Sequence, residues 1–191
     1  MADNDMWTIK AALDWTVGFL ERKGDDNPRL SAEWLMSEAT GLSRIELYVN
    51  FEQPLTLDER AVLRDFVARR GKGEPLQLIS GKVPFRYITV LVAPNVLIPR
   101  PETEVLVSEA FAELKLPRVA DHIAAGENGE EVVSPELPEL RVVDLCTGSG
   151  CIACSIASEY PAAHVVALDI APEALALAGK NIAALGLGDR V

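Results

Sequence analysis

The sequence contains no apolar run that approaches the roughly 20 residues needed to cross a lipid bilayer. Residues 1–5 also lack the basic segment that begins a secretory signal peptide. These two absences argue against a membrane-spanning or secreted protein, and we expect a cytoplasmic one.

Basic residues are scarce relative to acidic ones. The chain carries 18 Lys and Arg against 29 Asp and Glu, which gives a formal net charge of −11. Because neutralising nucleic-acid phosphates requires clustered Lys and Arg, direct nucleic-acid binding is not expected. A basic protein or a protein–RNA assembly is still a compatible partner. Nothing in the sequence signals an oligomer, and the expectation is a monomer.

Metal-ligating residues are also few, with two histidines and three cysteines in 191 residues. The cysteines are Cys146, Cys151 and Cys154. They allow a redox-active Cys-x-x-Cys pair or a metal site, but no fourth ligand lies nearby in the sequence. Free cysteine packs as a small hydrophobic residue, so a packing role is expected for all three and no metal site is predicted.

The most informative stretch reads RVVDLCTGSG over residues 141–150. Its valines indicate a buried strand, its glycines a loop, and the apolar spacing from Cys151 onward a helix. A second apolar run, 165–168, ends at Asp169. Strand, glycine loop, helix, strand and terminal carboxylate make the first half of a nucleotide-binding βαβ unit.

Two cofactor classes fit this unit. Gly148-x-Gly150-x-x-Ala153 matches a dinucleotide pattern, in which a pyrophosphate sits at the helix N-terminus. Asp144 would repel a pyrophosphate, but it suits a cationic cofactor such as S-adenosylmethionine. In both classes Asp169 can accept hydrogen bonds from the ribose hydroxyls. The residues favour the methyl donor and leave NAD as the alternative.

Residues 1–73 predict a small bundle of four helices, taken as the first domain. Asn27 and Pro28 form the N-terminal signature of the second helix. Capping boxes at Ser43 and Thr56 begin the third and fourth helices.

The first helix of this bundle is expected over residues 5–22. Trp7, Trp15 and Trp34 are expected to anchor the core. The basic residues between 69 and 72 are expected to form a solvated helix end, because cations are favourable at a helix C-terminus.

Residues 74–98 predict a β-hairpin linker. The apolar run 76–79 is expected as its first strand and 80–82 as its turn. The segment 85–92, rich in β-branched and aromatic residues, is expected as the second strand.

Residues 99–191 are expected to form an incomplete doubly wound, Rossmann-like domain, so that the whole chain is of the α/β class. Arg100 lies between two prolines that stiffen its backbone, which makes it a candidate for the edge of a site. A helix is predicted over 101–116. Residues 117–140 are rich in Gly, Pro and acid, and predict a surface loop or a disordered insertion. A third strand would begin at 189–191, so the chain is expected to be a fragment.

Three motifs, in this order, resemble those of the peptide chain release factor N5-glutamine methyltransferases. They are EPLQLISG at 74–81, LIPRPETE at 97–104, and DLCTGSG at 144–150 with Asp169 after it. The resemblance covers the chain apart from 117–140, and the second motif is the most specific. It implies transfer of a methyl group from S-adenosylmethionine to the glutamine side-chain amide in the Gly-Gly-Gln motif of class I release factors.

The resemblance also implies roles for individual residues. Cofactor binding is implied for Asp144, Cys146, Thr147, Gly148, Ser149, Gly150 and Asp169. Asp169 matches the ribose-binding acid and Asp144 the acid near the methionine part. Cys146 replaces the usual first glycine, where a positive φ is costly for cysteine. Arg100 and Thr103 are implied to border the cofactor and the substrate glutamine, and the helical domain to dock the release factor.

The family's Asn-Pro-Pro-Tyr motif, which holds the substrate amide, does not occur in residues 1–191. An amide nitrogen is a poor nucleophile, so catalysis depends on holding it in line with the methyl–sulfur bond. No catalytic residue is therefore assigned in this chain, the motif is expected beyond Val191, and the chain alone is expected to be inactive.

Two further interpretations stay open. Related amino-methyltransferases act on adenine or cytosine in nucleic acids, although the charge of −11 argues against that substrate. A non-catalytic binding module, in which the helical bundle recruits a partner, is the other. An NAD-dependent dehydrogenase is a more remote third.

Overall fold

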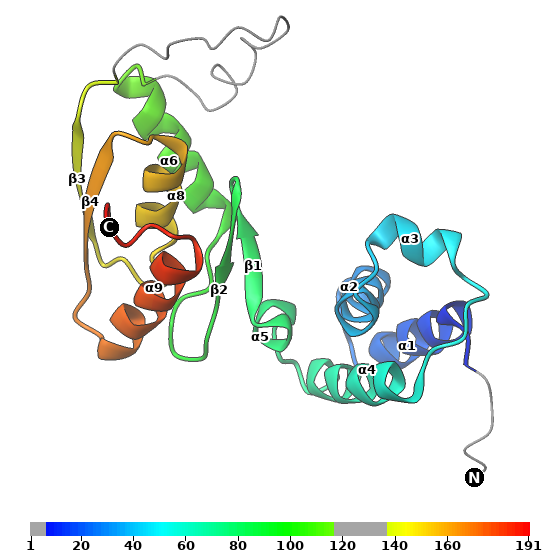
Figure 1. Ribbon diagram of the computed structural model, residues 1–191. Coiled ribbons are helices and arrows are strands. Elements are labelled where there is room, and N and C mark those ends of the chain that lie inside the picture. Colours follow the sequence, from blue (N-terminus) through cyan, green and yellow to red (C-terminus); the bar gives the residue numbers. More distant parts are fainter. Residues whose placement is uncertain (1–6, 117–136) are drawn as a thin grey trace, which may run out of the picture. The chain divides into compact units, whose positions relative to one another are not determined.

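The computed structural model describes residues 7–116 and 137–191, and the chain divides into two compact units, Met1–Ser80 and Gly81–Val191 (Figure 1). The first unit is helical. The second contains an antiparallel hairpin, two parallel strands and their helices. The predicted α/β fold class is therefore confirmed. In the described part of the chain, no helix is long and apolar enough to cross a membrane.

The first unit consists of short helices with well-formed caps. Its helices are α1 (Ile9–Arg22), α2 (Pro28–Thr40), α3 (Arg44–Val49), α4 (Leu57–Arg70) and α5 (Leu76–Ser80). Both predicted capping boxes are present: the Ser43 and Thr56 side chains accept hydrogen bonds from the amides of Glu46 and Glu59, whose carboxylates accept in return. Thr8 caps α1, and the part of its predicted range before residue 7 lies outside the described residues.

The core of this unit lies around α2, against which α1 and α4 both pack. It is built from fully buried aliphatic side chains, among them Ile9, Leu13, Leu20, Leu35, Met36 and Leu47. The expectation that Trp15 anchors this core is wrong, because its side chain is 49% exposed. Trp7 and Trp34 are half-buried. Trp15 instead stacks on Phe19 along the outside of α1.

The basic residues at the end of α4 are mostly paired rather than solvated. Arg69 makes two hydrogen bonds to the Glu74 carboxylate, at 2.8 and 2.6 Å. Arg70 donates to Asp25 at 2.6 Å. The prediction of a solvated helix end is thus wrong for these two arginines, since each cation meets a carboxylate from a neighbouring segment. Lys72 is exposed, as expected.

The hairpin of the second unit is shorter than predicted. It consists of β1 (Lys82–Phe85) and β2 (Ile88–Leu91), which pair antiparallel with Phe85 opposite Ile88. The expected first strand at 76–79 is wrong, because α5 occupies it. The carbonyl of Pro75 accepts hydrogen bonds from the amides of Leu78 and Ile79, which gives a helical turn.

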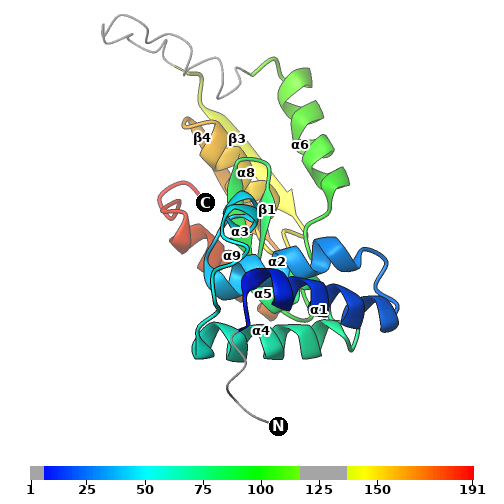
Figure 2. The same ribbon diagram turned by 90° about the vertical axis from the view of Figure 1, so that its right-hand side faces the viewer.

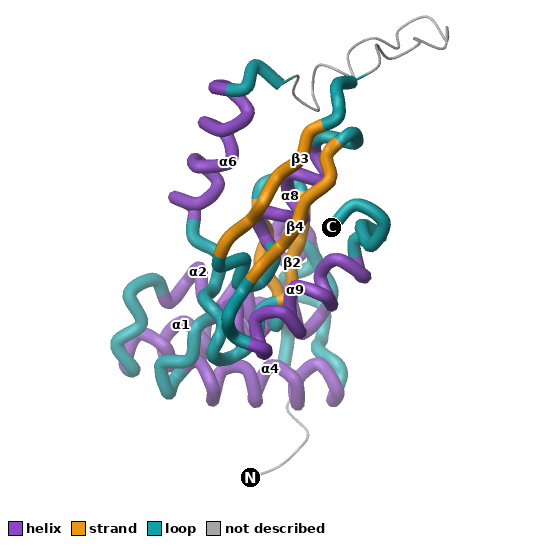
Figure 3. Tube along the Cα trace, turned by 90° about the vertical axis from the view of Figure 1, so that its left-hand side faces the viewer, coloured by secondary structure: helices purple, strands orange, loops and turns teal. Residues whose placement is uncertain are grey.

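The remaining elements form half of an open α/β sheet. Strands β3 (Leu140–Leu145) and β4 (Ala163–Leu168) run parallel and are connected by α8 (Cys151–Glu159). Helices α6 (Pro101–Glu113) and α9 (Pro172–Ala184) complete the unit. Figure 3 shows β3 and β4 in front of α8. The predicted insertion 117–140 falls mostly on residues outside the described ranges, and its last residue begins β3.

The prediction that Val142 and Val143 lie in a buried strand is wrong for Val143. Its side chain is 60% exposed, and Val166 on the neighbouring strand is 56% exposed. Successive side chains of a strand point to opposite faces. Among the described residues the helices lie on one face of this sheet, so the valines of the other face stay in contact with solvent.

Candidate functional site

The loop that joins β3 to α8 lies at the carboxyl end of the two parallel strands, where open α/β sheets bind ligands. We call residues 145–150 the cofactor loop. The amide of Thr147 donates to the carbonyl of Leu168 at 2.9 Å, which ties this loop to the end of β4. The amide of Gly150 donates to the Thr147 carbonyl at 2.9 Å, which closes a turn inside the loop.

Asp144 and Asp169 hold this loop from its two sides. The Oδ2 atom of Asp144 accepts hydrogen bonds from the Thr147 hydroxyl at 2.6 Å and from the Ala153 amide at 3.2 Å. The Oδ2 atom of Asp169 accepts one from the Gly148 amide at 2.8 Å. The sequence predicted that both carboxylates contribute to one cofactor site. In the structure, both accept hydrogen bonds from residues of the same loop.

The two carboxylates differ in their electrostatics. Burial raises the pKa of Asp144, and the charge of Asp169 adds to this effect. The backbone amides of Ala171 and Gly148 lower the pKa of Asp169, so Asp169 is ionised at neutral pH. Each Asp169 oxygen accepts one of these bonds and keeps capacity for another. Such a carboxylate suits a pair of ribose hydroxyls.

Three alternate residues of the segment take left-handed backbone conformations: Cys146 (φ +61°), Gly148 (+57°) and Gly150 (+79°). A positive φ is costly for a cysteine, and Cys146 nevertheless adopts it. Gly150 has a second constraint. A Cβ there would lie 3.1 Å from the Cβ of Ala178 on α9, so only glycine lets that helix approach the loop.

The cysteines divide by environment. Cys151 and Cys154 are buried in α8, which confirms their expected packing role. Cys146 is exposed, so the same expectation is wrong for it. Burial, with the neighbouring Cys151 thiol and then Asp144, raises the pKa of Cys154 to about 12. A search of the described residues finds no group of three His, Cys, Asp or Glu that could hold a metal ion.

Asn181 is a part of the site that the sequence analysis missed. Its buried amide donates to the carbonyls of Ser149 and Leu91 at 2.8 and 3.1 Å, and its oxygen accepts from the Leu91 amide at 2.7 Å. The side chain therefore fastens β2 to the cofactor loop. Its signal in the sequence was a polar residue four positions after Leu177 and three after Ala178, on the apolar face of a predicted helix.

Arg100 and Thr103 lie at the start of α6. Arg100 is its exposed N-cap, and the Thr103 amide donates to the Arg100 carbonyl at 3.0 Å. The preceding segment reaches the cofactor loop: Val96 Cγ1 lies 3.9 Å from where a Cβ of Gly148 would be. Among the described residues, no hydrogen bond joins Arg100 or Thr103 to the loop itself. The observation that bears on their predicted position beside the cofactor is the contact of the preceding Val96 with the loop.

The Ser149 hydroxyl of the loop is buried. It has no hydrogen-bond partner among the nitrogen and oxygen atoms of the described residues, but it lies beside the Cys151 thiol, whose pKa it lowers against the larger effect of burial. The half-exposed Gly148 and the ionised Asp169 are therefore the groups of the loop that fit a nucleoside.

Comparison with known protein families assigns both units. Residues 11–81 match the model of the PrmC N-terminal domain, and residues 127–190 match the methyltransferase small domain. The first match ends at the boundary of the helical unit, and the second contains the cofactor loop and Asp169.

Three similar proteins carry the name release factor glutamine methyltransferase. The one from Geobacter sulfurreducens is 46% identical over 177 residues, 93% of this chain and 55% of the relative. That from Rhodopirellula baltica is 40% identical over 97% of this chain and 57% of the relative. That from Chlorobaculum tepidum is 36% identical over the whole chain and 60% of the relative. The chain thus spans little more than half the length of these relatives, and over nearly all of its own length it is similar to the family of release factor glutamine methyltransferases.

Proposed function

We propose that this chain is part of an enzyme that methylates the side-chain amide of a glutamine, in the Gly-Gly-Gln motif of class I release factors, with S-adenosylmethionine as methyl donor. The observation that carries the proposal is the cofactor loop between two carboxylates, in a chain similar to this family. We further propose a cytoplasmic monomer, since release factors act at the ribosome.

S-adenosylmethionine, when bound, supplies a methyl group on a positively charged sulfur. We assign its binding to Cys146, Thr147, Gly148, Ser149, Gly150 and Asp169, with Asp169 accepting the ribose hydroxyls. Asp144 acts on the cofactor chiefly through Thr147 and Ala153, because its side chain is 6% exposed and its Oδ2 is occupied by those two groups. Its negative charge beneath the loop also favours a cation over a pyrophosphate.

Arg100 and Thr103 are proposed to border the substrate glutamine. The exposed Arg100 guanidinium, on a backbone stiffened by two prolines, offers donors to a backbone carbonyl of the Gly-Gly-Gln segment. The nitrogen that receives the methyl group must be held in line with the methyl–sulfur bond. This part of the proposal places the two residues at the entrance to the cofactor, on the side of Val96.

Calorimetry tests the cofactor assignment. The chain should bind S-adenosylhomocysteine or S-adenosylmethionine, and Asp169→Ala should weaken binding by at least about tenfold, because a charge-assisted pair of hydrogen bonds is lost. Glu173→Ala, which removes an exposed carboxylate in the first turn of α9, is the matched control and should bind normally. Binding of NAD instead of S-adenosylmethionine would assign the loop to a dehydrogenase.

Methyl transfer is tested with a chain of the relatives' full length. Tritium from methyl-labelled cofactor should appear on a class I release factor and disappear when the Gly-Gly-Gln glutamine is replaced by alanine. Arg100→Ala should lower transfer while leaving S-adenosylhomocysteine affinity within about twofold, because its proposed contact is with the protein substrate. Transfer to duplex DNA, but not to the release factor, would favour the nucleic-acid alternative.

A further inference from the structure

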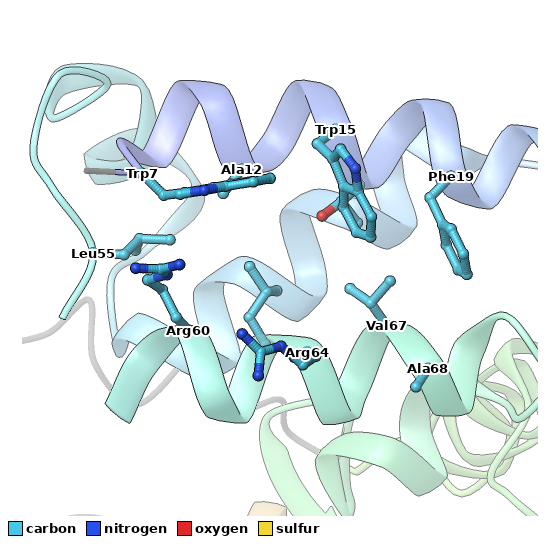
Figure 4. A pocket seen from close by; sticks show the side chains of 11 residues that line it. Trp7, Ala12, Trp15, Phe19, Leu55, Arg60, Arg64, Val67 and Ala68 are labelled. Atoms are coloured by element: carbon cyan, nitrogen blue, oxygen red, sulfur yellow. The ribbon is translucent and has the colours of Figure 1, made fainter. Parts of the chain in front are cut away.

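The helical unit contains an open apolar groove between α1 and α4, with a volume of about 410 Å³ (Figure 4). Both helices pack against α2 and touch each other much less. Figure 2 shows the ribbon of α1 above that of α4. Trp7, Trp15 and Phe19 form one wall, and Arg60, Arg64 and Val67 lie on the opposite wall. We call this feature the α1/α4 groove.

The aromatic wall of the groove is ordered before any partner binds. Trp15 stacks on Phe19 with ring centroids 5.3 Å apart and meets Trp7 edge-on at 6.0 Å. Gly71 makes room for Phe19, because a Cβ there would lie 2.8 Å from its ring. Rigid, half-exposed tryptophans of this kind are the residues that dominate binding energy in protein interfaces.

The groove also contains a polar group without a partner. Thr16 is 1% exposed and lines the groove, and its hydroxyl makes no hydrogen bond within the described part of the chain. A helical threonine usually satisfies its hydroxyl on a carbonyl of the preceding turn. An unsatisfied hydroxyl in the lining is an independent sign that a ligand group belongs there.

The charge of the groove selects among partners. Arg60 and Arg64 are one helical turn apart on α4, in a chain whose net charge is −11. Arg64 is exposed and makes no ion pair with any described residue. The nearest carboxylate on this helix, Asp65, is directed to Arg69 at 3.9 Å. The groove therefore combines an apolar wall with the exposed guanidinium of Arg64, and it is complementary to an apolar segment that also carries a carboxylate.

The dimensions of the groove indicate a helix as its occupant. On α4 the lining runs from Arg60 to Ala68, about 12 Å at the rise of an α-helix. This length accommodates about two turns of a partner helix, which would insert apolar side chains one turn apart. We propose that the α1/α4 groove docks an acidic amphipathic helix of a partner protein, with its apolar side chains against Trp15 and Phe19 and a carboxylate at Arg64.

The test uses the complete chain and synthetic peptides of about 16 residues, a length at which isolated helices can form. The first peptide carries a leucine face flanked by glutamates, and the second has lysine in place of each glutamate. Fluorescence anisotropy of the labelled peptides measures affinity. The glutamate peptide should bind at least about tenfold more tightly than the lysine peptide.

Variants of the groove separate docking from folding. Trp15→Ala and Arg64→Glu should each weaken the glutamate peptide by at least about tenfold, and Arg64→Glu should improve the lysine peptide. Arg22→Glu makes the same charge change outside the groove lining and should bind like the wild type.

Three results would overturn the proposal. One is equal affinity for the two peptides, and another is no binding of the glutamate peptide. The third is concentration-dependent self-association in sedimentation equilibrium that Trp15→Ala abolishes, which would assign the groove to a second copy of the chain. Circular dichroism of each variant must match the wild type, so that a loss of affinity reports the groove and not unfolding.

Discussion

Removing the buried ion pair between Arg86 and Glu159 should lower the free energy of unfolding of the second unit substantially. Arg86 lies in the hairpin turn at φ +50°, and its guanidinium makes two 2.6 Å hydrogen bonds to the Glu159 carboxylate at the end of α8. It also donates to the Glu104 carbonyl at 3.0 Å and to the Ser108 hydroxyl on α6. One side chain thus joins the hairpin to two helices.

The magnitude follows from this geometry. The side chains are 12% and 5% exposed, and the Ser155 hydroxyl also donates to Glu159 at 2.6 Å. Charge centres about 4 Å apart attract by about 4 kcal/mol at an effective dielectric constant of about 20. Removing one partner leaves the other charge buried, which typically costs about 3–5 kcal/mol. Arg86→Met should therefore lower the unfolding midpoint of this unit by more than about 10 °C.

The tryptophans make the assay specific. All three lie in the helical unit, at positions 7, 15 and 34, so tryptophan fluorescence follows Met1–Ser80 alone. Far-ultraviolet circular dichroism follows both units. Arg86→Met should shift the dichroism transition and leave the fluorescence transition in place. Arg86→Lys, which keeps the charge but loses the two-pronged contact, should cost less.

A double-mutant cycle completes the test. Arg86→Met with Glu159→Met removes both charges, so the double variant should be destabilised by less than the sum of the two single variants. A single-variant cost below about 1 kcal/mol would refute the reasoning, because it would mean that the pair is as weak as an exposed one. An equal shift of the fluorescence transition would also refute it.

Further predictions concern the cofactor loop and the residues that pack against it. Asp144→Ala should cost about 1–3 kcal/mol in chemical denaturation, because two buried donors lose their acceptor, and Asp144→Asn should cost less. Since burial raises the pKa of Asp144 above its ordinary 3.8, the wild type should lose stability relative to Asp144→Asn as the pH rises above that value. Asn181→Ala should cost about 2–4 kcal/mol and weaken S-adenosylhomocysteine binding in calorimetry, because three backbone groups lose their partner. Cys146→Gly should raise the unfolding free energy by up to about 1 kcal/mol, since a left-handed residue is relieved of its Cβ. In a thiol-labelling time course, Cys146 should react and Cys154, with its pKa of about 12, should not until the chain unfolds.

Local interactions could be predicted from the sequence because their partners lie within a few residues. The capping boxes at Ser43 and Thr56 need only a glutamate three positions on, and both are present. Pro28 and Pro101 begin helices as expected, because a missing amide hydrogen costs nothing in the first turn. The strand–loop–helix–strand order around Gly148 could be predicted for the same reason, from the spacing of the apolar residues and the position of the loop glycines.

Long-range polar contacts could not be predicted. Arg86 and Glu159 are 73 positions apart, and Asn181 binds Leu91 across 90. Each charged or amide side chain in isolation has the sequence signature of a surface residue. Their partners are specified by how the hairpin, α8 and α9 pack, which no local pattern encodes. The strand predicted at 76–79 was wrong for a related reason: a segment of four residues, three of them apolar, suits a strand and a helical turn equally well.

The backbone at Cys146 shows how the fold overrides a local rule. A left-handed conformation costs a residue with a Cβ about 1–2 kcal/mol, which favours glycine at this position. The neighbouring carboxylates nevertheless fix the next two residues: Asp144 holds the Thr147 hydroxyl, and Asp169 holds the Gly148 amide. These two hydrogen bonds fix the residues that follow Cys146, so the backbone of Cys146 is held in its conformation from outside the residue. The same acids that were predicted from cofactor chemistry therefore also explain why this loop tolerates a cysteine.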